Sequence, residues 1–142
     1  MNGRWSIVGA AVILAAAAHA DRPDLIISAL EVPRSLKQGR CNQFDVRVEN
    51  LEAAATPGRI AVRLHLQFAS GGEAQHIRVL NGIGPRGGRG AVQTVSFTEV
   101  AIPGSGRVSY AATVNPDGAV PETVIDERNS AAGSGASAGS CP

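Results

Sequence analysis

The chain has 142 residues, the length of one domain with a short leader. It carries 13 basic and 12 acidic residues, and this near-neutral balance gives no support for binding nucleic acid or another polyanion. Aromatic residues make up only 4% of the chain, so its core must be built mainly from valine, isoleucine and leucine, which suits short strands.

The first twenty residues predict a cleaved signal peptide. Arg4 supplies a positive charge, residues 7–18 form an uncharged apolar run, and Ala18-His19-Ala20 is a small-x-small cleavage site. The run is shorter than the roughly 20 apolar residues that cross a bilayer, which makes a retained membrane anchor the weaker alternative. We expect an exported protein, periplasmic or secreted, with no membrane insertion after cleavage before Asp21.

The first half of the mature chain alternates between apolar and polar residues with the period of a half-buried strand. In the segment CNQFDVRVEN, for example, Phe44, Val46 and Val48 share one face. We expect strands over residues 24–32, 41–50 and 59–68. Residues 35–40 predict a polar turn around Gly39, and residues 51–58 a loop that ends at Pro57-Gly58.

The second half predicts three further strands, over residues 73–80, 91–100 and 107–114. The apolar pattern slips between Val92 and Val95, which indicates a β-bulge. Residues 81–90 contain five glycines and predict a flexible loop. Arg86 and Arg89 in this loop could meet an anionic partner or simply form a hairpin tip. Six or seven short strands without a helix signal predict an all-β sandwich of antiparallel strands.

Three segments carry a family resemblance: DLIISALEVP at the start, the strand that ends in VRVEN, and VNPDGAVPETVIDERNS near the end. Together they resemble the CARDB module, a bacterial cell-adhesion-related domain. The resemblance covers residues 21–130 and implies an immunoglobulin-like β-sandwich of exported proteins. Two features depart from the family pattern. Asn115 stands where the family usually has aspartate, and residues 131–142 are an Ala/Gly/Ser-rich tail instead of a β-branched strand.

Cys41 and Cys141 are the only cysteines. In an exported chain an even count predicts a disulfide, although two free thiols or an intermolecular pair would also fit the sequence. The tail is a poor strand former. It would pair as an edge strand if Cys141 were bonded to Cys41, and it would otherwise be disordered.

A set of oxygen-bearing side chains follows the last predicted strand. Calcium takes ligands of this kind, but the spacing matches no EF-hand loop. The alternative is structural: one member stabilises its turn, Glu122 accepts backbone N–H bonds at the last corner, and the others form a solvated face. The set comprises Asn115, Asp117, Glu122, Asp126 and Glu127. We expect no other cofactor.

The sequence contains no catalytic constellation. It has no Gly-x-Ser-x-Gly elbow and no Ser-His-Asp order. His65 and His76 lie on neighbouring predicted strands, but two ligands without a third make a weak metal site, and exposed surface histidines are the alternative. We expect a non-catalytic, adhesion-related module that binds an envelope protein or a glycan. A structural spacer or envelope component is the second interpretation, and a small hydrolase or metal-dependent enzyme the third.

Overall fold

The computed structural model describes residues 22–123 and 125–142. The predicted signal peptide, residues 1–20, lies outside this range. Seven strands and one short 3-10 helix build the described part: β1 (Leu25–Glu31), β2 (Leu36–Asn50), β3 (Ile60–Phe68), β4 (Glu73–Leu80), β5 (Val92–Ile102), β6 (Gly106–Val114), η1 (Glu127–Asn129) and β7 (Ser130–Ser140). The predicted all-β fold is therefore confirmed.

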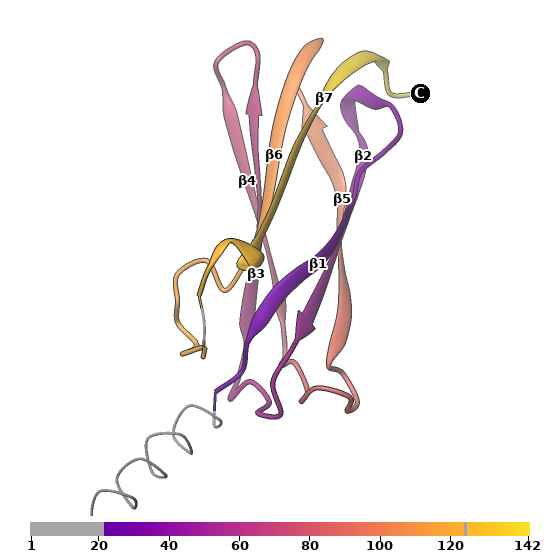
Figure 1. Ribbon diagram of the computed structural model, residues 1–142. Helices are drawn as coiled ribbons and strands as arrows, with labels where there is room; N and C mark the ends of the chain where they lie inside the picture. The colour runs from indigo at the N-terminus through magenta and orange to yellow at the C-terminus, as the bar shows by residue number, and fades with distance from the viewer. Residues whose placement is uncertain (1–21, 124) are drawn as a thin grey trace, which may run out of the picture.

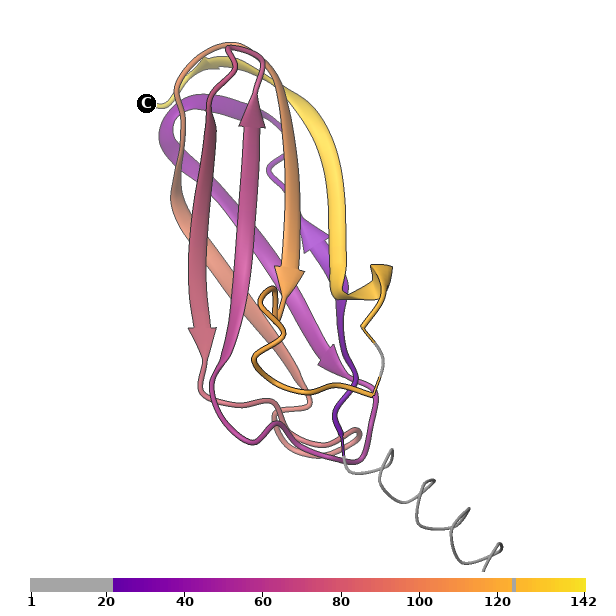
Figure 2. The same ribbon diagram turned by 90° about the vertical axis from the view of Figure 1, so that its left-hand side faces the viewer.

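The strands form two layers that face each other (Figures 1 and 2). In one layer β2 pairs antiparallel with β1 and with β5. In the other layer β3 lies between β4 and β6, and β7 continues the sheet beyond β6, all antiparallel. The start of β2 joins this second layer through a short parallel pairing with β7, so β2 connects the two sheets.

The core lies between the sheets, and the alternating strands of the sequence supply it. Of the residues predicted to share the inner faces of β2 and β3, all but Phe68 are buried, with exposed fractions of 0 or 1%, and Phe68 packs partly buried against the core. The buried residues are Phe44, Val46, Val48, Ile60, Val62, Leu64 and Leu66. Each buried aliphatic or phenylalanine side chain stabilises the fold by about 1.5–3 kcal/mol relative to an exposed one, so these two strands make up the centre of the domain.

Two predicted features near the edges of β2 and β5 are wrong. β2 begins at Leu36, inside the predicted turn, because Leu36 is buried and Gly39 bends the strand without ending it, at a φ of +110°. The register of β5 with β2 is continuous from Val92 to Phe97. Its irregularity lies beyond Phe97, where Glu99 has a φ of 53°, and Val92 is simply exposed on the outer face.

The Ala/Gly/Ser-rich tail forms β7, so the sandwich extends beyond residue 130 to Ser140. β7 runs alongside β6 over the full length of that strand (Figure 2). Its small residues allow close contacts: a Cβ atom on Gly133 would lie 2.9 Å from the Tyr110 hydroxyl oxygen, and one on Gly135 would lie 3.2 Å from Leu36 Cδ1. The close packing of the Tyr110 ring therefore favours glycine at position 133, where strand propensity alone disfavours it, and a Cβ atom at position 135 would require only a small shift of Leu36.

The glycine-rich loop of residues 81–90 is anchored to the body of the sandwich. Ile83 is 1% exposed and belongs to the core. The Asn50 amide donates to the Gly84 carbonyl at 2.9 Å, and the Gln93 amide donates to the Gly82 carbonyl at 2.7 Å. The sequence predicted a flexible loop because the burial of Ile83 and the hydrogen bonds from Asn50 and Gln93 are tertiary contacts that the local glycine pattern does not reveal.

Candidate functional site

A buried carboxylate, that of Glu122, closes the corner between β6 and η1. It is 6% exposed. Its Oε1 atom accepts a hydrogen bond from the backbone N–H of Leu25 at 2.8 Å, and its Oε2 atom accepts one from Asn115 Nδ2 at 2.8 Å. Asn129 Nδ2 lies 3.0 Å from both oxygens. The carboxylate is thus surrounded by N–H donors, as the structural alternative for Glu122 expected.

Asn115 shapes the turn that leads into this corner. Its φ of 52° lies in the left-handed region, which asparagine tolerates better than most residues. Its Nδ2 also donates to the Val120 carbonyl at 2.7 Å, and its Oδ1 accepts from the Val120 N–H at 3.2 Å. Asp117 is exposed and accepts from the Ala119 N–H at 3.3 Å, so it stabilises the turn.

Asp126 caps η1. Its Oδ1 accepts from the Arg128 N–H at 2.9 Å, while Asn129 Oδ1 accepts from the Asp126 N–H at 3.1 Å, which completes a capping box. The Arg128 guanidinium contacts Asp126 at 3.0 Å and reaches Asp24 at 3.4 Å. Burial raises the pKa of Asp24, and the charge of Arg128 offsets part of this effect.

Of the five residues in the predicted set, Asn115 and Glu122 contact each other directly. Asp126 joins them through Asn129, whereas Asp117 and Glu127 are exposed. Within residues 22–123 and 125–142, no group of three or more His, Cys, Asp or Glu side chains is arranged to hold a metal ion. The corner that these residues build is a hydrogen-bonded closure of the sandwich, and calcium binding stays a prediction.

The structure does not bring His65 and His76 together. In the β3–β4 register, His76 lies opposite Leu64 and His65 lies opposite Gln75, so their side chains are on opposite faces of the sheet. His65 Nε2 is 3.2 Å from Glu73 Oε2 on the outer face. His76 faces the interior, where burial and then the charge of Arg78 lower its pKa.

Cys41 and Cys141 form a disulfide, with their Cα atoms 5.7 Å apart. The bond fixes the end of β7 beside the bend in β2, where Figure 1 shows the carboxyl terminus. The backbone N–H of Cys141 donates to the Gln38 carbonyl at 2.7 Å. The last residues of the chain are therefore held both covalently and by the sheet.

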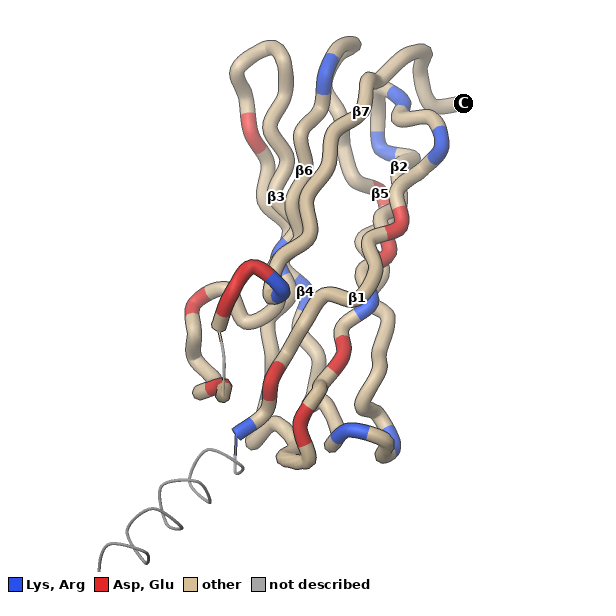
Figure 3. The backbone as a smooth tube through the Cα atoms, viewed as in Figure 1, with Lys and Arg blue, Asp and Glu red and all other residues tan. Residues whose placement is uncertain are grey.

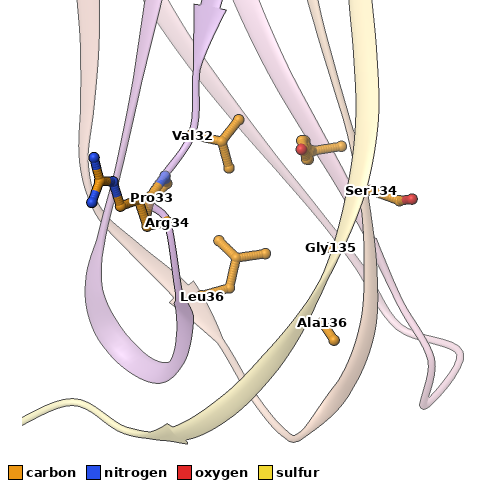
Figure 4. Close-up of a pocket in the computed structure, with 8 residues that line it drawn as sticks. Val32, Pro33, Arg34, Leu36, Ser134, Gly135 and Ala136 are labelled. Carbon is orange, nitrogen blue, oxygen red and sulfur yellow. The ribbon is translucent and has the colours of Figure 1, made fainter.

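A groove of about 230 Å³ lies between the β1–β2 connection and β7 (Figure 4). Val32 and Leu36 point into it, and Tyr110 forms part of its wall. Arg34 is the one charged residue among its lining residues, which are Val32, Pro33, Arg34, Leu36, Tyr110, Ser134, Gly135 and Ala136. In the described part of the chain, β2 pairs with β7 only from Ser137 onward, so residues 130–136 have one open strand edge beside the groove.

Sequence reasoning missed the role of a second buried amide, that of Asn50, which is 1% exposed. Its Oδ1 accepts from the N–H groups of Asp24 and Glu52, and its Nδ2 donates to the carbonyls of Ala54 and Gly84. Asn50 thus joins the entry of β1 to two loops. The sequence signal for this role was the asparagine at the end of VRVEN, which is Asn50. The asparagine of ERNS is the corresponding signal for Asn129.

The two-layer fold and its hydrogen-bonded corner define an immunoglobulin-like β-sandwich module. The CARDB family model matches residues 22–133. The chain therefore belongs to the CARDB family. No curated protein matches it. In the described residues, no helix is long and apolar enough to cross a membrane.

Solved structures of low sequence identity share this fold. The crystal structure of a CARDB domain from Pyrococcus furiosus, described as a complex with di-metal ions, is 20% identical with a TM-score of 0.65, and the match covers 82% of this chain and 94% of that one. A solution structure of that domain has 19% identity and a TM-score of 0.61 over 84% and 97% of the two chains. A β-glucosidase from Listeria innocua matches with 12% identity and a TM-score of 0.55, over 83% of this chain and 16% of that enzyme.

Proposed function

We propose that this protein is an exported, non-catalytic interaction module that binds another protein or a glycan of the cell envelope. The observation that carries the proposal is the open edge of β7 beside an apolar groove. Open strand edges are natural sites for association, because their backbone N–H and C=O groups lack partners.

The polar residues of the corner support a non-catalytic role. Glu122 and Asn115 are occupied by hydrogen bonds to each other and to the backbone. A general acid or base needs a carboxyl group within reach of a substrate, whereas Glu122 is buried and Asn115 has no acid–base chemistry. The groove, by contrast, contains no carboxylate or histidine. The surface available for binding is thus separate from the acidic residues.

Affinity capture tests this function. Residues 21–142, oxidised and folded, are immobilised and exposed to an envelope extract of the source organism, followed by mild cross-linking. We expect one protein or glycan to be enriched over a reduced, unfolded control of the same chain. Enrichment that is equal on both forms, or absent from both, would contradict the proposal.

A structural spacer is the second candidate. The Cys41–Cys141 disulfide and the buried Glu122 network favour it, because both stabilise the sandwich without creating a binding surface. The absence of any captured partner, together with a high free energy of unfolding, is the result expected of a spacer.

A further inference from the structure

We propose that the groove beside β7 binds an extended acidic peptide, which adds as a strand to the open edge of β7 and places one apolar side chain in the groove. This inference rests on the proposed function and narrows it to one partner class and one surface.

The backbone of β7 provides the docking edge. β6 pairs with β7 from Thr113 opposite Ser130 to Gly106 opposite Ser137. Successive residues of a strand direct their N–H and C=O groups to alternate sides, so about half of these groups in residues 130–136 point away from β6. β1 contacts β7, but no β1–β7 pairing is present among the residues that the structure describes. These groups therefore have no partner strand along residues 130–136.

β7 is a better template than β4, the strand at the far edge of the same sheet. Proteins protect exposed strand edges with charged residues and proline. β4 carries Glu73, His76 and Arg78, and the Arg78 guanidinium folds inward to lie 5.4 Å from the centre of the Phe97 ring. Residues 130–136 contain neither a charged residue nor proline, so the edge of β7 lacks this protection.

The groove limits what the peptide can insert. At about 230 Å³ it is smaller than the roughly 300–1,000 Å³ of small-molecule sites. Val32 and Leu36 point into it (Figure 4), and Tyr110 also lines it. Every second side chain of an added strand would face the groove. The size and lining fit one apolar side chain.

The charge beside the groove selects an acidic partner. Arg34 is exposed at the rim. Arg107 donates to Ser134 Oγ at 2.9 Å on the outer face of β7, and Figure 3 shows Lys and Arg positions gathered around the start of β2. No aspartate or glutamate lines the groove. β7 has no acidic residue of its own. A dimer that paired β7 with β7 would therefore place no carboxylate from β7 beside Arg34.

A designed peptide tests the proposal directly. The probe is an acetylated, amidated octapeptide of alternating valine and threonine with one glutamate near each end. It is titrated into isotope-labelled, oxidised residues 21–142 and followed by the backbone amide signals in NMR spectra. We expect shifts confined to residues 32–36 and 130–136 and to the Tyr110 ring. Shifts that centre on β4, or no shifts at millimolar peptide, would overturn the proposal.

Two charge-reversal variants test whether the charge of Arg34 contributes to peptide binding. The exposed guanidinium of Arg34 makes Arg34→Glu compatible with folding, and Arg89→Glu is a matched charge reversal on the exposed loop of residues 81–90. We expect Arg34→Glu, or lysine in place of glutamate in the probe, to weaken binding about tenfold. Arg89→Glu should leave the affinity within about twofold. Equal effects of the two reversals would refute the specific role of the groove.

Backbone methylation isolates strand addition. Two probes are methylated on the nitrogens of alternate residues, one on the odd positions and one on the even positions. Only one set of N–H groups faces β7 in an added strand, so one probe should lose binding and the other should keep it. Equal binding of both probes would show that no strand forms.

The capture experiment distinguishes two proposals: that the protein is an interaction module, and that it binds an acidic peptide at the edge of β7. A partner that Arg34→Glu still captures supports an interaction module but refutes this peptide site. The same is true if a glycan is captured, or if the folded chain captures a second copy of itself. A partner lost in Arg34→Glu and kept in Arg89→Glu supports both proposals.

Discussion

The Glu122 carboxylate accepts the backbone N–H of Leu25 at 2.8 Å, a hydrogen bond between residues 97 positions apart. Leu25 is the first residue of β1, and Glu122 lies in the connection between β6 and η1. The hydrogen bond therefore connects the start of β1 to the segment that leads into β7. Because the carboxylate is buried, each of its hydrogen bonds contributes to the free energy of folding.

Glu122→Gln should lower the free energy of unfolding by about 1–3 kcal/mol. The variant keeps the shape of the side chain but replaces one acceptor oxygen with an NH₂ group, which would face the Nδ2 groups of Asn115 and Asn129. Urea unfolding at neutral pH measures the change. Glu127→Gln is the control, because Glu127 is exposed, and it should change stability by less than about 0.5 kcal/mol. Equal losses would disprove the buried network.

Asn115→Asp should destabilise the corner most at neutral pH. It removes the Nδ2 donor that now contacts Glu122 and Val120 and places two carboxyl groups together, so that one of them must keep a proton in the folded state. The folded variant then binds more protons than its unfolded chain, and its stability rises as pH falls toward 4. Unfolding of the variant and the wild type at pH 4.5 and 7.5 checks this, and a deficit that does not depend on pH would contradict it.

His76 should make the protein less stable in mild acid. Burial, followed by the charge of Arg78, lowers the pKa of His76 from its usual value of 6.5. As pH falls through 6.5 the unfolded chain binds the proton first, so stability is full above this pH and decreases as pH approaches the lowered value. The raised pKa of Asp24 acts in the opposite direction at lower pH.

His76→Leu therefore should lose less stability than the wild type between pH 7.5 and pH 5. Thermal unfolding of both proteins across this range measures the difference, and His65→Gln on the outer face is the control. The interpretation fails if the control flattens the pH dependence as much as His76→Leu does.

Replacing both cysteines, Cys41→Ser with Cys141→Ser, should cost about 2–5 kcal/mol of stability, because the bond closes a loop of 100 residues. Amide hydrogen exchange should become faster first at residues 137–140, next to the lost bond, and later at residues 130–136. The same comparison in the wild type with and without reductant needs no mutation. Equal protection of β7 in both states would mean that the sheet alone holds the strand.

The sequence predicted the strands whose side chains alternate, and with them the core, since Phe44 and Leu64 need only the period of their own strands. It predicted a strand in the tail only on the condition of a Cys41–Cys141 bond, because the side chains that pack against the glycines of β7, Tyr110 and Leu36, are remote in sequence. The corner was predicted in part. The acceptor role of Glu122 was foreseen as an alternative, but its partner Leu25 lies 97 positions away and no local pattern reveals it.

The position of β7 also has a consequence for how the protein is made. A polypeptide emerges amino end first, whether from the ribosome or from an export channel. β2 spends this time without its parallel neighbour, and Cys41 without the thiol that lies 100 positions behind it. Contacts so distant along the chain slow folding. The β2–β7 pairing and the Cys41–Cys141 disulfide can therefore form only after the last residues of the chain have emerged.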